Sequence, residues 1–410
     1  MAWVIKGTSL GKLLNVSLNQ SGVLNNSLRG ACIPQIFAIQ TANISGKALR
    51  DKARKRPPPY PYKSKTYGFW NALFDKTTWR FDDNSKIIVV EGPIGVGKTT
   101  FAKALADDLE MLHLPECNMD MKYINDYGFD IRQLDPQLPE SCQSFDIQKF
   151  YDNPNHQNVA SFQIEMYRLR YEQYLDALSH LLSTGQGVVM ERCAFSDFVF
   201  LEAMHKAGYI SRGARSVYYD ISKNTIPELL RPHLVIYLDI PVKKVQERIK
   251  KRNIPYEVNS KVLTPKYLSD VEEFYKLRFL KEISQHSELL VYDWSDFGDV
   301  EVVIEDIERI DFDQYDKYEL KLRDWRLADE WAWCELRQKY TKGRHFLMNN
   351  FLVPRLDVPE LLIPAGDIVQ RDLVYSQTPS MKHSRGFNAD AGDTGLLFKD
   401  KEPPKEQLHS

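Results

Sequence analysis

The sequence predicts an α/β fold, a doubly wound parallel sheet of five strands with helices on both faces. Five short apolar runs alternate with segments of helical periodicity, which is the pattern of a parallel sheet covered on both sides. In addition, the first run enters a glycine-rich turn that opens directly into an amphipathic helix. The expected strands are residues 87–91, 111–116, 187–190, 234–239 and 289–292.

The glycine-rich turn, Gly92–Thr100, has the spacing G-x-x-x-x-G-K-S/T of a phosphate-binding loop. Its glycines let the backbone N–H groups point inward, and the following helix presents its partly positive N-terminus to the same anion. Lys98 is expected to meet the β- and γ-phosphates, and the Thr99 hydroxyl a Mg²⁺ ion. The phosphate-binding residues expected from this loop are Gly92, Gly95, Val96, Gly97, Lys98, Thr99 and Thr100.

Charged residues follow the second and third expected strands. Glu116 ends the second strand, and Glu191 and Arg192 end the third. Because ligands of open parallel sheets bind beyond the carboxyl ends of the strands, these groups are expected beside the phosphate loop. A long helix expected from about residue 159 places Gln163 and Arg170 on one face, since they are nearly two turns apart. The alternative interpretation of Gln163 and Arg170 is a polar helix face that lies in water. The alternative for Glu191 and Arg192 is an ion pair at the end of a strand.

Composition and cysteine spacing exclude several functional classes. The chain has 410 residues and a formal net charge of −2, so no overall field points to nucleic acid as a partner. No apolar run approaches the roughly 18 residues that a membrane span needs. The five cysteines are far apart and form no C-x-x-C pair, which leaves a disulfide framework, a zinc site and an iron–sulfur cluster unsupported.

Both ends of the chain differ from the central part. Residues 1–50 carry five basic residues and no acidic one, which predicts a mitochondrial transit peptide, with a disordered tail as the alternative. Residues 51–85 form a basic, proline-rich arm that lies either on this protein or on a partner. A phosphate-loop domain is expected over 86–300, followed by a tail over 301–410.

The tail is expected to make assembly contacts. A charged amphipathic helix is expected from Asp316 to Leu336, with Leu322 and Trp325 among its packing residues. The proline-punctuated segment that follows is expected to be extended, and the polar end flexible. A tail folded back on its own domain is the alternative.

Residues 86 to about 300 resemble the deoxynucleoside kinases. The matching motifs are Gly92–Thr100, Pro115-Glu116, Phe162-Gln163, Glu191-Arg192 and a basic lid helix ending at Arg252. The resemblance implies that Glu116 is the base toward the substrate 5′-hydroxyl, that Glu191 helps to hold Mg²⁺, and that Arg192 lies near the reacting phosphate.

The same resemblance implies a nucleoside pocket. Gln163 matches the glutamine that pairs with the base. Arg170 and Asp197 match a pair found in members that accept deoxycytidine or purine deoxynucleosides. Tyr151, whose alignment is off by one residue, and Glu257 match contacts to the sugar 3′-hydroxyl.

The lid departs from the kinase pattern. Where the kinases carry another arginine two residues beyond Arg252, this chain has Ile254. Tyr256 replaces an acidic lid residue, and Cys193 replaces a serine. Arg248 and Arg252 remain as phosphate ligands. A missing lid arginine removes a contribution of the kind worth about 10³–10⁵ in phosphoryl-transfer rate, so the site is better suited to hold a nucleotide than to turn it over.

The transit peptide, the kinase-like core and the long tail together resemble accessory subunits of mitochondrial respiratory complex I. This resemblance implies other complex I subunits as partners, a peripheral place on the matrix side of the inner membrane, and no FMN or iron–sulfur cluster. The expected ligand is a purine nucleotide, dGTP or ATP, with Mg²⁺. The alternative hypothesis is an active mitochondrial deoxynucleoside kinase that transfers the ATP γ-phosphate to a deoxynucleoside 5′-hydroxyl.

Overall fold

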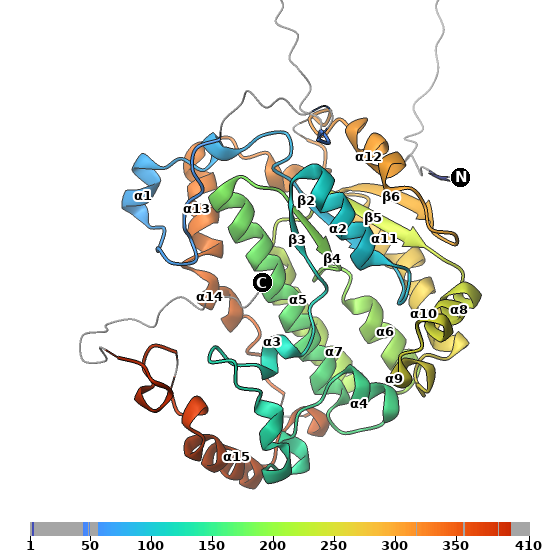
Figure 1. Ribbon diagram of the computed structural model, residues 1–410, viewed down its shortest axis with the longest axis vertical. Coiled ribbons are helices and arrows are strands. Elements are labelled where there is room, and N and C mark those ends of the chain that lie inside the picture. The colour runs from blue at the N-terminus through green and yellow to red at the C-terminus, as the bar shows by residue number, and fades with distance from the viewer. Residues whose placement is uncertain are drawn as a thin grey trace, which may run out of the picture.

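The computed structural model describes residues 2–3, 44–47, 49, 56–316, 318–355, 357–383 and 385–394 (Figure 1). The five predicted strands form a parallel sheet in the order β6-β5-β2-β4-β3, which confirms the doubly wound fold. They are β2 (Ile87–Glu91), β3 (Leu112–Leu114), β4 (Val188–Glu191), β5 (Leu234–Asp239) and β6 (Glu288–Asp293). A two-residue strand that the sequence did not predict, β1 (Ala2–Trp3), pairs antiparallel with β6.

Helices cover both faces of the sheet because successive strand residues point to opposite sides. Ile87 and Val89 join one core, to which helices α5 (Val159–Thr184), α6 (Phe198–Lys206), α7 (Arg212–Thr225) and α10 (Pro265–Phe274) contribute. Ile88 and Val90 join the other core with helices α2 (Lys98–Leu109), α8 (Val242–Arg252) and α12 (Val300–Glu308). The long helix predicted from residue 159 is therefore confirmed as α5.

Short helices fill the connections. The segment between β3 and α5, residues 117–158 and hereafter the insertion, contains α3 (Asp120–Tyr123), α4 (Ile147–Asp152) and two 3₁₀ turns at Ile131–Gln137 and Glu140–Cys142. Beyond α8 lie α9 (Pro255–Val258), a π-helical turn at Tyr275–Phe279 and α11 (Leu280–Ile283). None of the helices in the described ranges is long and apolar enough to cross a membrane.

The predicted transit peptide lies outside the described residues except for β1, residues 44–47 and residue 49. Ile44 is buried in the core that α2 covers. The backbone N–H of Ser45 donates to Asn84 Oδ1 (2.9 Å), and Asn84 Nδ2 donates back to the Ser45 carbonyl (2.8 Å). At least this part of the 1–50 segment therefore packs against the domain.

The proline-rich arm, as far as the structure describes it, lies on this protein's own surface. The backbone N–H of Tyr60 donates to the carbonyl of Ser183 at the end of α5 (3.1 Å), and Arg80 Nε donates to the carbonyl of Pro58 (3.0 Å). The arm also contains a helix that the sequence did not predict, α1 (Phe69–Phe74).

The helix expected from Asp316 begins only at Glu330, as α13 (Glu330–Tyr340). Upstream of it, the guanidinium of Arg326 binds several backbone carbonyls, including those of Tyr315 (3.0 Å) and Glu319 (2.8 Å), and these carbonyls therefore do not form a helix. Asp329 then caps α13 by accepting from the N–H of Ala332. Leu322 is buried and Trp325 packs on the core, as predicted.

The rest of the tail, as far as the structure describes it, folds back on its own domain. Ser179 Oγ of α5 donates to the carbonyl of Tyr340 (2.8 Å), and Arg344 of α14 (Arg344–Asn349) pairs with Asp176. The segment expected to be extended contains a further helix, α15 (Ala365–Gln377), which begins directly after Pro364. The polar end predicted to be flexible lies outside the described residues from 395 onward.

Candidate functional site

A cavity of about 760 Å³ opens at the carboxyl ends of β2, β3 and β4. The sheet order places β4 and β5 on opposite sides of β2, so the loop after β2 lies at the switch point where such sheets bind ligands. The phosphate loop, the insertion, α5 and the segment from α8 to α10 line the cavity. Its volume is that of a small-molecule site.

The phosphate loop requires glycine at both of its ends. Gly92 has a φ of 147°, and a Cβ at this position would lie 2.8 Å from the carbonyl oxygen of Leu238. Gly97 has a φ of 96°, and its Cβ would lie 2.9 Å from the ring of Phe297. The loop then passes directly into α2 at Lys98, so the helix N-terminus faces the cavity.

Lys98 is buried at the floor of the cavity. Its Nζ donates to the carbonyl of Pro93 (3.0 Å) and lies 4.0 Å from Glu116 Oε2. Burial and the nearby positive charge of Arg192 lower the pKa of the Lys98 ammonium to about 8, against the opposing effect of Glu116. An anion entering the loop would reverse this shift, because it would supply the charge that the buried ammonium lacks.

Glu116 is held among cations. Arg192 forms an ion pair with Glu116 Oε1, and Arg170 Nη2 lies 3.6 Å from the same oxygen. Burial alone would raise the pKa of the Glu116 carboxyl, but Arg192, Lys98 and Arg170 outweigh burial and lower that pKa to about 2. Glu116 is therefore ionised throughout the physiological range.

Gln163 and Arg170 line the cavity and are both held by Asp197. Gln163 Nε2 donates to Asp197 Oδ2 (2.8 Å), Arg170 forms an ion pair with Oδ1, and the hydroxyl of Tyr218 donates to Oδ2 (2.7 Å). Asp197 itself is fully buried and does not line the cavity, so it positions the other two residues. Glu116, Gln163, Arg170 and Arg192, with Asp197 behind them, are called the acceptor wall below.

The predicted sugar contacts also reach the cavity. Tyr151 and Glu257 both line it and are both buried. Arg252 Nη1 lies 3.5 Å from Glu257 Oε1, whereas Oε2 is buried and has no hydrogen-bond partner in the part of the chain that the structure describes. Burial raises the pKa of the Glu257 carboxyl. A buried acceptor without a partner suits a ligand hydroxyl.

Thr99 and Glu191 lie together at the mouth of the phosphate loop. Thr99 Oγ1 donates to Glu191 Oε2 (2.7 Å), and Glu191 Oε1 lies 3.1 Å from His113 Nε2. Two oxygen donors of this kind, completed by phosphate oxygens and water, suit Mg²⁺. Sequence reasoning missed His113, although it is the one polar residue in the otherwise apolar strand Leu112–Leu114.

The lid helix α8 contributes only one of its two predicted arginines to the cavity. Arg252 lines it, but the guanidinium of Arg248 turns away and donates to the carbonyls of Val96 (2.9 Å), Trp294 (2.7 Å) and Ser295 (3.0 Å). Arg248 also stacks on Phe297, 4.2 Å from the ring centre. Of the predicted phosphate ligands, Gly92, Val96 and Arg248 do not line the cavity, whereas Gly95, Gly97, Lys98, Thr99, Thr100, Arg192 and Arg252 do.

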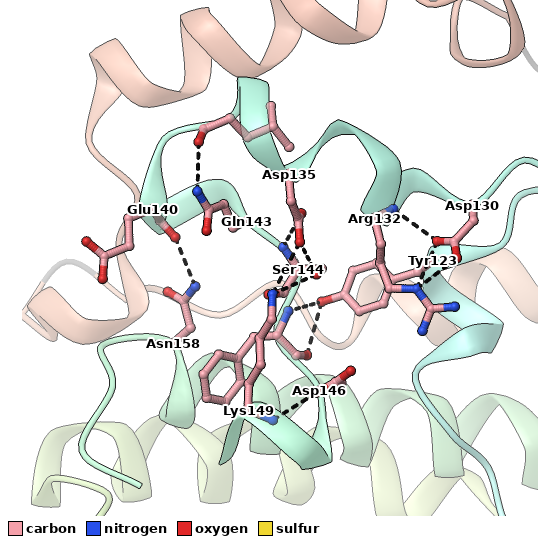
Figure 2. A network of polar contacts seen from close by, with 12 residues as sticks. Tyr123, Asp130, Arg132, Asp135, Glu140, Gln143, Ser144, Asp146, Lys149 and Asn158 are labelled. Atoms are coloured by element: carbon pink, nitrogen blue, oxygen red, sulfur yellow. Dashed lines mark hydrogen bonds and ion pairs between the residues drawn. The ribbon is translucent and has the colours of Figure 1, made fainter. Parts of the chain in front are cut away.

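Apart from Tyr151, the residues of the insertion that line the cavity were not assigned to the site by sequence reasoning. Arg132 and Asp120 both line the cavity, and Arg132 Nη1 lies 2.8 Å from Asp120 Oδ1. Arg132 Nε also donates to Asp130 Oδ1 (2.9 Å). Figure 2 shows the polar network that holds this segment together, in which Tyr123 and Lys149 bind neighbouring turns. The insertion carries none of the motifs by which the family was recognised, so no sequence signal marked these residues.

Several known proteins are similar to this chain. A family model described as deoxynucleoside kinase matches residues 88–324. The chain is 38% identical over 336 residues to mouse NADH dehydrogenase (ubiquinone) 1 alpha subcomplex subunit 10, mitochondrial, covering 81% of this chain and 90% of the mouse protein. It is 28% identical over 236 residues to deoxyguanosine kinase from Dictyostelium discoideum, covering 58% of this chain and 73% of that protein. Among solved structures, deoxyadenosine kinase from M. mycoides with bound dATP matches with a TM-score of 0.41 and 22% identity, covering 54% of this chain and 96% of that one.

Proposed function

Because the chain belongs to the deoxynucleoside kinase family and, within it, to the group of the alpha subcomplex subunit 10 proteins, we propose that it is an accessory, non-redox subunit of mitochondrial complex I that holds a nucleotide in its kinase-like site. In this role the chain supports the assembly and stability of the complex from the matrix side of the inner membrane. The proposal that the chain holds a nucleotide rests on a difference between two parts of the cavity. Ion pairs hold the acceptor-wall residues together around the cavity, whereas Arg248 of the lid binds backbone carbonyls outside it.

One purine nucleoside triphosphate, dGTP or ATP, would occupy both halves of the cavity. The phosphates would lie on the loop, beside Lys98 and Arg192, which donate charge-assisted hydrogen bonds. The base would meet Gln163 and Arg170, which offer both donors and an acceptor to a purine edge. Glu257 would accept a hydrogen bond from a sugar hydroxyl, which gives its buried oxygen a partner.

Thr99 and Glu191 would hold a Mg²⁺ ion delivered with the triphosphate, and the ion would neutralise part of the phosphate charge. The hydrogen bond between these two side chains keeps both oxygens at the end of the phosphate loop. His113 keeps the Glu191 carboxylate oriented toward Thr99, because it occupies the other carboxylate oxygen.

Nucleotide binding without phosphoryl transfer is favoured for two physical reasons. Phosphoryl transfer needs cations placed around the moving phosphate, and the three carbonyls that bind Arg248 keep it out of the cavity. A general base also works best when its pKa lies near the working pH, whereas the cations around Glu116 lower its pKa to about 2.

The proposed membership of complex I is tested by tagging the chain in its own organism and separating mild-detergent extracts of mitochondria on native gels. We expect the tagged chain to migrate with NADH dehydrogenase activity in a stoichiometric amount. Depleting the chain is expected to lower the quantity of assembled complex. A chain that migrates only as a free protein, with normal complex assembly after depletion, would contradict the proposal.

An active deoxynucleoside kinase is the second candidate. It is favoured by the convergence of Lys98, Thr99, Glu116, Glu191 and Arg192 around one cavity. The test is phosphate transfer from labelled ATP to each common deoxynucleoside by the purified chain, with Glu116→Gln and Lys98→Ala as inactive controls. Transfer that both variants abolish would establish the kinase, and no transfer to any deoxynucleoside would exclude it.

A further inference from the structure

Helix α1 presents an aromatic face that no described part of the chain covers. Trp70 is 73% exposed and Phe74 is 80% exposed. The aromatic face, as defined here, consists of Phe69, Trp70, Leu73, Phe74, Trp79 and Trp331, all of which are exposed. Figure 1 shows α1 at the periphery of the molecule, beside α13. An exposed apolar cluster of this kind marks an interaction surface.

The aromatic face is anchored firmly to the domain beneath it. The hydroxyl of Tyr67 donates to the carbonyl of Asp75 at the end of α1 (2.9 Å). The carboxylate of Asp75 pairs with Arg80 (2.6 Å) and with the buried Arg337 of α13 (3.0 Å). Phe69 packs edge-on against Trp331, with ring centres 5.7 Å apart. The outward side chains are therefore part of a fixed surface.

Within residues 61–79 the exposed charges are positive, whereas α13 contributes the exposed carboxylates of Asp329 and Glu335 on the Trp331 side of the aromatic face. Lys63 and Lys65 lie in the turn just before α1, and Lys76 lies just after it; all three are exposed. The Nζ of Lys76 lies 5.4 Å from the ring centre of Trp79. Asp75 is the one acidic residue between positions 61 and 79, and it is paired with two arginines. The segment thus combines exposed tryptophan and phenylalanine with uncompensated lysine.

We infer that the aromatic face docks on an anionic lipid surface, with the α1 rings in the headgroup region and the lysines against lipid phosphates. Tryptophan with flanking lysine is the composition of segments that lie in a membrane interface. The core of a protein–protein interface is enriched in tryptophan and phenylalanine but depleted in lysine, which makes a protein partner the less favoured occupant. The inference adds a membrane contact to the proposed function but does not depend on nucleotide binding or on complex I.

The test is sedimentation of the purified full chain with phosphatidylcholine vesicles that contain or lack cardiolipin. We expect the chain to sediment with the anionic vesicles and to remain largely free with the neutral ones. The double variant Trp70→Ser with Phe74→Ser is expected to weaken this binding by about tenfold or more, since two large apolar side chains no longer enter the interface. The triple variant Lys63→Gln, Lys65→Gln, Lys76→Gln is expected to remove the preference for anionic lipid.

The matched control is Val369→Ser with Leu373→Ser on α15, which Figure 1 places well away from α1. Both side chains are exposed, so the control removes surface apolar groups without touching the aromatic face, and it should bind vesicles as the wild type does. Retained cooperative unfolding of each variant establishes that it is folded.

Three outcomes would overturn the inference. The first is the absence of wild-type binding to anionic vesicles, and the second is equal binding by the wild type and the α1 double variant. The third is a wild-type dimer, measured by sedimentation equilibrium, that the α1 variant converts to monomer, since a second copy would then cover the face. None of these results depends on whether the chain migrates with complex I, so the proposed function and this inference fail separately.

Discussion

The acceptor wall and the lid of the cavity differ in where their cations are directed. On the acceptor wall, Arg192 and Arg170 surround Glu116, and Asp197 fixes Arg170 from behind. On the lid, Arg248 faces backbone carbonyls outside the cavity, and Arg252 has an exposed side chain beside Glu257. The nucleoside half of the cavity is thus held together by ion pairs among its own residues, whereas on the lid Arg248 is held away from the cavity. On the proposed function, we therefore expect binding to depend mainly on the acceptor wall and the phosphate loop, and the loss of turnover to depend in part on the lid.

The largest effect is expected where the acceptor wall is anchored. Asp197→Ala leaves donors on Gln163, Arg170 and Tyr218 without their buried acceptor. Removing one partner of a buried ion pair typically costs about 3–5 kcal/mol, and we expect a loss of that size in the free energy of unfolding. Urea unfolding followed by circular dichroism measures it. Asp220→Ala, at an exposed position of α7, is the control, and a loss no greater than that of the control would show that the wall is not anchored by Asp197.

Lys98→Ala is expected to reduce affinity for dGTP by about a hundredfold, because truncating one partner of a buried charge pair costs about 2–5 kcal/mol. Isothermal titration calorimetry with dGTP and Mg²⁺ measures the dissociation constant. The control, Lys103→Ala, removes an exposed lysine from the same helix and should leave affinity unchanged. Equal affinities of the two variants would mean that the triphosphate does not lie on the phosphate loop.

The pH dependence of binding tests the same lysine. Free Lys98 has a pKa lowered to about 8, so above pH 8 binding must restore its proton, and affinity should fall by up to about tenfold per pH unit. The stability of the free protein changes with pH in the opposite direction. Between pH 8 and the unfolded-state pKa near 10.5 the unfolded chain binds more protons, so this group's contribution to stability rises with pH.

Calorimetric titrations from pH 7 to pH 10 measure this dependence, and Lys98→Arg supplies the comparison because a guanidinium stays charged throughout. The arginine variant should show a flatter profile. Identical slopes for the two proteins would assign the titration to another group.

The smallest effect is expected from rebuilding the lid. Ile254→Arg restores a cation where the kinases carry one, and at this partly exposed position a new charge contact is worth at most about 1 kcal/mol, or a few-fold in triphosphate affinity. Val258→Arg adds the same charge at an exposed position of α9 and serves as the control. A gain that both variants share would reflect general attraction by positive charge, with no specific role for the lid.

The sheet was predictable because its signals are local. Four of the five strands contain an uninterrupted apolar run, and β3 is interrupted only by His113. The glycines of the phosphate loop are required by backbone geometry, as the carbonyl close to Gly92 shows. Glu116, Arg192, Gln163 and Arg170 of the acceptor wall were predictable because they lie at strand ends or on one face of α5, whereas Asp197 was expected only from the family resemblance. Their placement around one cavity follows from the fold.

The sequence predictions were wrong or incomplete where contacts with distant residues decide the local structure. Nothing near Asp316 signals that Arg326 will bind the carbonyls of the residues before it, and this contact delays the helix until Glu330. Arg248 lies one helical turn before Arg252, as expected of a second phosphate ligand. However, the loop after β6 supplies carbonyls that bind its guanidinium outside the cavity. Short α1 gave no periodic signal, although its aromatic side chains define an exposed face.

The central claim is that this chain holds a nucleoside triphosphate without turning it over. The most direct measurement is to isolate the tagged chain with its native assembly, release its ligand with acid, and identify and quantify it by mass spectrometry. We expect about one intact purine triphosphate, dGTP or ATP, per chain, released from a complex with NADH dehydrogenase activity. An empty site, or a free chain that carries nucleoside monophosphate and transfers phosphate in a turnover assay, would contradict the claim.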